Sequence, residues 1–164
     1  MDAIEALKTR RSVRTYKSDP VPRKMLDEIV DCGRLAASAR NVQPWEFVVV
    51  TDAAMRQKVA QATEANGAFI SQAPACIVVF CDTTTYFLED GSAATQNILV
   101  AARAMGLGSC WIAGDKKPYA DKVREILGVP PKMKLIALVA LGYTNETPAP
   151  LKRALKEVVH WEKW

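Results

Sequence analysis

The sequence has few of the residues that build common catalytic sites. His160 is the only histidine, and none of the four cysteines (Cys32, Cys76, Cys81 and Cys110) forms a C-x-x-C pair. A zinc site is therefore not expected. Both glycine-rich phosphate motifs, G-x-G-x-x-G and G-x-x-x-x-G-K-[ST], are also absent. Any phosphate group must then be held by side chains.

The chain also lacks a long apolar run, and its first residues have neither the basic start nor the apolar stretch of a signal peptide. We therefore expect a cytoplasmic protein that does not insert into a membrane. The 22 Lys and Arg residues exceed the 18 Asp and Glu residues by a modest +4. This balance suits a small anionic ligand better than a nucleic acid, because the arginines are not interleaved with aromatic residues.

The 164 residues are 49% hydrophobic, which suffices for one compact domain spanning residues 1–164. Apolar periodicity alternates between the two element types along this domain. It predicts strands at 46–51, 75–81, 109–113 and 135–141, and helices at 25–33, 52–66, 89–105 and 118–128. From Thr144 the composition becomes polar and rich in proline, so residues 144–164 should form an extended tail on a surface of this chain or of a partner.

The densest group of hydrogen-bond donors is Arg10-Arg11-Ser12-Val13-Arg14. Guanidinium groups match phosphate oxygens, and a serine hydroxyl can add a bond from another direction. Lys152 and Arg153 lie at the other end of the chain, and a fold that joined the two ends would form an anion pocket. A solvated basic face is the alternative.

Catalysis by the chain's own side chains has little support. A serine nucleophile needs a base, and His160 lies near the terminus between Val159 and Trp161. Glu89 and Asp90 are adjacent, so their side chains diverge on a helix, which favours solvated surface or a cap. By elimination, difficult chemistry would have to come from a bound cofactor.

Five blocks of sequence, in order, resemble the FMN-dependent nitroreductases in their short, minimal form. The resemblance covers nearly the whole chain and rests on the blocks 10–16, 38–45, 94–99, 106–112 and 141–143. It implies an α+β sandwich in which helices flank a central mixed or antiparallel sheet. It also implies an interlocked homodimer with two FMN sites at the subunit interface, and residues 144–164 packing on the partner subunit.

The resemblance also implies the residues that bind the cofactor. Arg10 and Ser12 would bind the FMN phosphate, and Arg14 would reach the pyrimidine edge of the flavin, where negative charge gathers on reduction. The block Ser38 to Gln43 would come from the other subunit, and Lys152 and Arg153 would return to the phosphate. The full set of expected cofactor-binding residues is Arg10, Arg11, Ser12, Arg14, Ser38, Ala39, Arg40, Asn41, Gln43, Ile112, Ala113, Gly114, Lys152 and Arg153. Within this set, Ile112, Ala113 and Gly114 would line flavin N5, where a backbone N–H can donate.

The implied activity is hydride transfer from NAD(P)H through flavin N5 to a nitroaromatic, a quinone or a similar acceptor, with ping-pong kinetics. NADH and NADPH are both open as reductants. No side-chain acid is obviously required for this reaction. The stretch between Asn66 and Tyr86 is too short for inserted helices that would cover the flavin, so we expect an open pocket. The alternatives are a non-catalytic flavin-binding or storage protein and a specialised flavin enzyme that destroys flavin or removes halogen reductively. Ala37 stands where many relatives have a proline before the serine, which loosens the preset geometry of the loop but removes no donor. Pro150 and Lys152 stand where relatives often carry a basic residue and an arginine, so the assignment of tail contacts to particular side chains is open.

Overall fold

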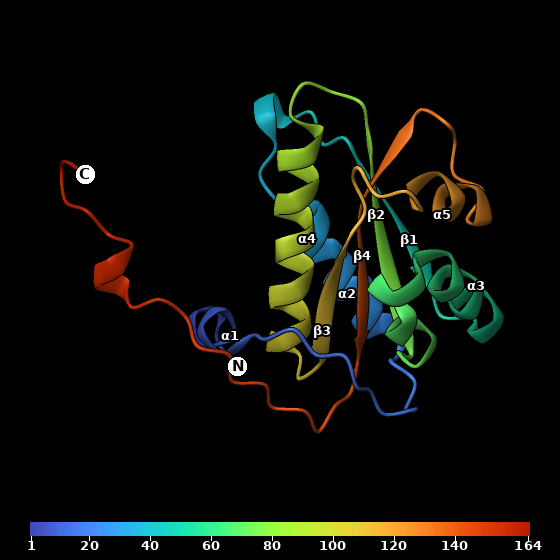
Figure 1. The fold of residues 1–164 in the computed structure, drawn as a ribbon, viewed down its shortest axis with the longest axis horizontal. Helices are drawn as coiled ribbons and strands as arrows, with labels where there is room; N and C mark the ends of the chain where they lie inside the picture. Colours follow the sequence, from blue (N-terminus) through green and yellow to red (C-terminus); the bar gives the residue numbers. More distant parts are fainter.

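A four-stranded antiparallel sheet forms the centre of the computed structural model, which describes residues 1–164 (Figure 1). The strand order is β1-β2-β4-β3, and every neighbouring pair runs antiparallel. The strands are β1 (Trp45–Val50), β2 (Ala75–Asp82), β3 (Gly108–Ala113) and β4 (Met133–Gly142). All four lie within two residues of their predicted bounds, because each is a short apolar run flanked by turn residues. The predicted α+β fold is confirmed, with an antiparallel rather than a mixed sheet.

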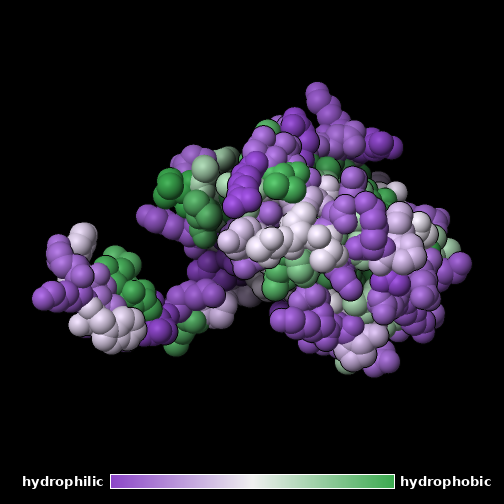
Figure 2. Space-filling model, turned by 90° about the horizontal axis from the view of Figure 1, so that it is seen from above, coloured by the Kyte–Doolittle hydropathy of each residue, from purple (hydrophilic) through white to green (hydrophobic).

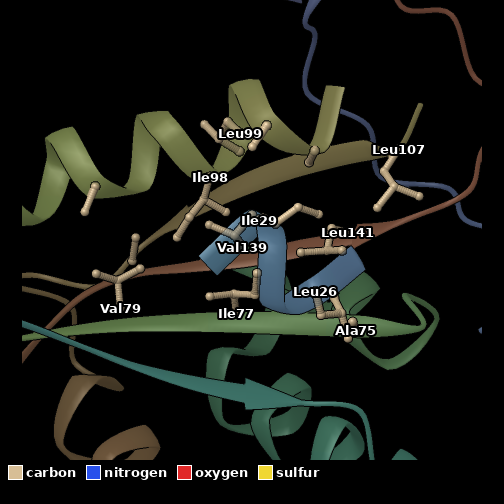
Figure 3. Close-up of a cluster of buried hydrophobic side chains, with 14 of the residues drawn as sticks. Leu26, Ile29, Ala75, Ile77, Val79, Ile98, Leu99, Leu107, Val139 and Leu141 are labelled. Carbon is tan, nitrogen blue, oxygen red and sulfur yellow. The ribbon is translucent and has the colours of Figure 1, made fainter. Parts of the chain in front are cut away.

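Helices cover both faces of the sheet. On one face, α2 (Arg23–Arg34) and α4 (Phe87–Ala104) bury a core against alternate residues of the central strands, including Ile77, Val79, Val139 and Leu141 (Figure 3). On the other face, α3 (Ala53–Thr63) and α5 (Ala120–Ile126) pack on the intervening residues. Because successive side chains of a strand point to opposite faces, β2 and β4 read as continuous apolar runs in the sequence.

Two segments lie outside these three layers. The short helix α1 (Ala3–Thr9) is capped by Asp2, whose side chain accepts the Glu5 N–H, and it contacts α4. At the other end, the tail that follows β4 runs past α1 and away from the body of the molecule (Figure 1). Residues 149–164 are all exposed, and their only helical turn is Leu155–Glu157. No helix combines the length and the apolar character that crossing a bilayer requires.

Candidate flavin site

The Arg10–Arg14 segment lies along the outer edge of β3. Ser12 forms a parallel bridge with Ser109, and the Val13 N–H donates to the Ser109 carbonyl at 3.0 Å. This approach requires Gly108, since a Cβ there would lie 3.0 Å from Val13 Cγ1 and 2.7 Å from Thr144 Cγ2. The basic segment found in the sequence is therefore held against the edge of the sheet by an isolated bridge.

Extended backbone separates the segment into two faces. Burial raises the pKa of the Cys110 thiol, while Arg14, Ser12 and Arg10 act on that pKa in the opposite direction. Arg10, Ser12 and Arg14 alternate along the segment, and in an extended backbone alternate side chains share one side. We call these three side chains the donor trio. Two cations and a hydroxyl on one face of an ordered segment form a suitable site for an anion.

Arg11 points the other way, together with the buried Val13. Its guanidinium donates to the backbone oxygens of Lys8 at 2.9 Å and Arg10 at 2.7 Å. Arg11 thus ties the segment to the end of α1. It lines a small cavity of about 110 Å³ together with Arg10 and with Arg103, a cation from the last turn of α4 that the sequence motifs did not single out.

The edge of β3 continues from the donor trio toward Ala113. The Gly114 N–H donates to the Ile136 oxygen of the neighbouring strand at 3.0 Å, so it is already paired. Because N–H groups alternate in direction along an antiparallel strand, the Ala113 N–H points away from β4 to the open edge. Ala113 itself is exposed, while Ile112 is buried in the core. Of the three residues predicted near flavin N5, Ala113 therefore carries the available donor.

The loop of residues 38–43 has a strained and well-braced backbone. Arg40, Asn41 and Gln43 have positive φ angles of 53°, 57° and 52°, although none of them is glycine. The Ser38 hydroxyl accepts the Gln43 N–H at 3.0 Å, which closes the loop on itself. Such conformations are costly and persist only where the surrounding structure holds them. They occur frequently at ligand sites.

This loop is held by a residue that the sequence analysis interpreted wrongly. Asp90 is not solvated surface, because it is only 5% exposed and its Oδ1 accepts the Ala39 N–H at 2.9 Å. The adjacent Glu89 is exposed, as expected. The error arose because Asp90 lies on a helix face whose partner, the loop, is remote in sequence.

The two halves of the predicted site lie at opposite ends of α4. Asp90, which contacts the loop, is in the first turn of the helix, and Arg103, which borders the Arg10–Arg14 segment, is in the last turn. At 1.5 Å per residue these turns are roughly 20 Å apart. A single chain therefore does not bring the loop and the donor trio together.

The tail cations are also apart from the donor trio. Lys152 and Arg153 are both exposed, and the Arg153 guanidinium donates to the Glu157 backbone oxygen at 2.6 Å within the tail itself. Several of the most exposed apolar side chains lie in the same tail, among them Leu151, Trp161 and Trp164. Figure 2 shows green, hydrophobic residues on the tail, which extends away from the body of the molecule. The tail thus presents these cations and apolar side chains to solvent.

Comparison with known proteins identifies the family. The sequence matches the nitroreductase family over residues 7–75 and 62–143, so the chain belongs to this family of oxidoreductases, as its motifs predicted. An FMN-dependent nitroreductase from Clostridium difficile superposes with a TM-score of 0.91 at 34% identity, covering 98% of this chain and 99% of its own.

Two further relatives bear on the cofactor and the reductant. A Desulfovibrio desulfuricans protein solved in complex with FMN superposes with a TM-score of 0.88 at 27% identity, covering 100% of this chain and 98% of its own. A Vibrio harveyi NADPH-flavin oxidoreductase is 30% identical, over 96% of this chain and 72% of its own length.

Proposed function

We propose that this protein is an FMN-dependent NAD(P)H oxidoreductase that works as a homodimer. Each flavin would lie between the Arg10–Arg14 segment of one subunit and the 38–43 loop of the other. The observation that carries the proposal is the donor trio, which shares one face of an ordered segment at the same strand edge as the Ala113 N–H. FMN, when bound, supplies hydride transfer at N5 between NAD(P)H and an acceptor.

The spacing of the donors fits the cofactor. Ser12 pairs with Ser109, and Ala113 lies four residues further along the same strand, roughly 13 Å away. A ribityl phosphate and part of a three-ring system can cover such a length. Arg10 and Ser12 thus bind the phosphate at one end, and the Ala113 N–H donates to the ring at the other. The guanidinium carbon of Arg14 lies 5.9 Å from the centre of the Phe69 ring.

The residues of this arrangement stabilise charge on the flavin, orient its ring or bind its phosphate. Arg14 places a permanent positive charge at the pyrimidine edge of the ring, which favours the reduced, more negative state. The Ala113 N–H fixes the ring by a directional bond at the reacting nitrogen. Ser38 and Asn41 add polar contacts from the second subunit, and Lys152 and Arg153 add charge at the phosphate when the tail docks.

The case for a homodimer rests on the distance between the 38–43 loop and the Arg10–Arg14 segment, which lie at opposite ends of α4. A twofold axis would place the loop of one subunit beside the donor trio of its partner and would complete two equal sites. The exposed apolar residues of the tail, with Ile4 and Leu7 of α1, supply surface for that contact. Isolated apolar patches of this kind mark interaction sites.

An open site favours flat, diffusible oxidants such as nitroaromatics and quinones. Between α3 and β2 the chain has only two short helical turns, Glu64–Asn66 and Ala68–Ser71, and the connection from β2 to α4 is shorter still. No inserted helix is therefore available to cover a flavin at the edge of β3. We expect a broad acceptor range and the use of one binding face by donor and acceptor in turn.

The proposal is tested by FMN titration of the purified protein, followed by flavin fluorescence. The wild-type chain should bind one FMN per subunit, and Arg10→Ala and Ser12→Ala should each weaken binding by about tenfold or more through loss of a charged or hydroxyl partner. Lys17→Ala, an exposed cation just outside the segment, is the matched control and should bind normally. A wild-type protein that binds no FMN would refute the proposed function.

A further inference from the structure

The buried carboxylate of Asp90 has no role in the proposed chemistry and needs a separate explanation. Its Oδ1 accepts one hydrogen bond, from Ala39 N–H, and its Oδ2 has no partner within the chain. The Thr84 hydroxyl nearby is also buried without a partner, and both residues border a cavity of about 150 Å³ beside Ala39 and Arg40. No salt bridge neutralises the carboxylate.

A carboxylate buried for a single hydrogen bond contributes little to stability by itself. The position of Asp90 in the first turn of α4 offsets part of the cost, since the helix dipole favours negative charge there. The hydrogen bond that accompanies this unfavourable burial fixes the position of one backbone atom, Ala39 N. That atom begins the helical turn Ala39–Asn41, which contains two of the three positive φ angles.

The loop needs such an anchor because its own bonds are local. Within the loop, the Asn41 N–H donates to Ser38 O and the Val42 N–H to Ala39 O, and the Ser38 hydroxyl accepts the Gln43 N–H. These bonds define its shape but leave its position relative to the helices open. The bond from Ala39 to Asp90 is the one that joins the loop to α4. Without this bond, the loop should keep its internal hydrogen bonds but shift relative to α4.

We propose that Asp90 is a positioning residue that acts across the subunit interface, holding the 38–43 loop of one subunit in place for the flavin of the other. This inference rests on the proposed function, because the loop has a flavin to contact only in the assembled dimer. Asp90 does not touch the cofactor. It sets where Ser38 and Asn41 lie when the partner's donor trio binds the phosphate.

Three variants test the anchor. Asp90→Leu removes the acceptor at similar size, Asp90→Asn retains a carbonyl oxygen for Ala39, and Glu89→Gln removes the neighbouring exposed charge as a control. We expect Asp90→Leu to weaken FMN binding by about tenfold, from the lost buried acceptor and the displaced loop. Asp90→Asn should restore most of that affinity, and Glu89→Gln should match the wild type. Equal losses in the Asn and Leu variants, or no loss in either, would overturn the inference.

A mixed dimer tests the action across the interface. Subunits carrying Arg10→Ala and Asp90→Leu, each with its own affinity tag, are coexpressed, and the heterodimer is purified through both tags. One of its two sites then combines an intact Arg10 with an intact Asp90 from different subunits, whereas the other site carries both defects. We expect one FMN per heterodimer to bind with wild-type affinity, although both parent homodimers bind weakly.

The outcomes separate the two proposals. A heterodimer without a wild-type site would show that Asp90 and Arg10 serve the same subunit's site, which overturns the inference while leaving FMN binding intact. If Asp90→Leu does not fold as a homodimer, Asp90→Ala replaces it in the heterodimer, where the partner subunit supplies an intact Asp90. The Asp90→Asn variant then still shows whether a retained side-chain oxygen is sufficient for FMN binding. A wild-type protein that binds no FMN would instead overturn the proposed function and this inference with it.

Discussion

The carboxylate of Glu146 accepts a hydrogen bond from the backbone N–H of Arg14 at 2.9 Å, and a second comes from the next residue, Thr15, at 3.1 Å. Glu146 belongs to the start of the tail, so the beginning and the end of the chain are joined directly beside the donor trio. The Thr144 hydroxyl adds a bond to the Thr15 oxygen at 2.8 Å. The position of the Arg14 guanidinium thus depends on a residue outside its own segment.

We predict that Glu146→Ala loosens the Arg10–Arg14 segment. Two hydrogen bonds to a charged acceptor are lost, which should lower the free energy of unfolding by about 1–2 kcal/mol and weaken FMN binding severalfold. Urea unfolding and FMN titration measure the two effects. Glu125→Ala, at an exposed position on α5, is the control. Unchanged FMN affinity in Glu146→Ala would show that the segment holds its shape without this brace.

Arg14→Ala should slow flavin reduction by NAD(P)H and make the flavin potential more negative. The reason is that a permanent positive charge is removed from the ring edge where negative charge develops, and one such interaction is commonly worth about tenfold or more in rate. Arg14→Lys keeps the charge but loses the planar fork, so it should be intermediate. Stopped-flow reduction and redox titration of the two variants check the order. A wild-type potential in Arg14→Ala would remove the electrostatic role assigned to this residue.

The buried thiols predict a loss of stability at alkaline pH. Burial raises the pKa of the Cys76 and Cys81 thiols from 9.0 to about 12. Both thiols are buried in the folded chain, so they stay protonated there while they ionise in the unfolded chain. Their contribution is complete below about pH 9 and is lost as the pH rises toward 12, at up to about 1.4 kcal/mol per pH unit for each thiol.

Urea unfolding from about pH 8 to about pH 10.5 measures this slope. Cys76→Ala removes one of the two thiols, so its unfolding free energy should fall less steeply with pH than that of the wild type. The same slope in both proteins would mean that Cys76 does not stay protonated in the folded chain.

Removing residues 149–164 should abolish the dimer at micromolar concentration and weaken FMN binding. The tail exposes large apolar side chains, with Trp161 at 82% and Leu151 at 99%, which a partner subunit would bury. Sedimentation velocity measures the mass. The double variant Lys152→Ala with Arg153→Ala is the matched comparison, and it should remain dimeric while binding FMN less tightly. A truncated chain that still forms the dimer would contradict the role given to the tail.

The fold could be predicted largely from local patterns. The runs that became β2 and β4 are apolar on both faces, and Gly106 and Gly128 end their helices with positive φ angles, as their positions indicated. The strand order β1-β2-β4-β3 could not be derived from periodicity, because it depends on which edges meet in space. The family resemblance predicted the α+β sandwich and its central mixed or antiparallel sheet, but not this order of strands.

The candidate site was predicted in part. A dense arginine motif made the Arg10–Arg14 segment visible in the sequence, but the opposite direction of Arg11 depends on the bridge between Ser12 and Ser109. Arg103 and Asp90 were not predicted because each borders the candidate site through a contact with a segment remote in sequence. The apolar periodicity of a sequence does not indicate contacts between segments that are far apart along the chain.

Anaerobic addition of NADH, and separately of NADPH, to the FMN-loaded protein decides whether it is an NAD(P)H oxidoreductase. We expect at least one nucleotide to bleach the visible flavin absorption stoichiometrically, and a quinone or nitroaromatic then to restore it. Flavin that binds with one FMN per subunit but keeps its absorption with both nucleotides would contradict the assignment as an NAD(P)H oxidoreductase and would leave a flavin-binding protein.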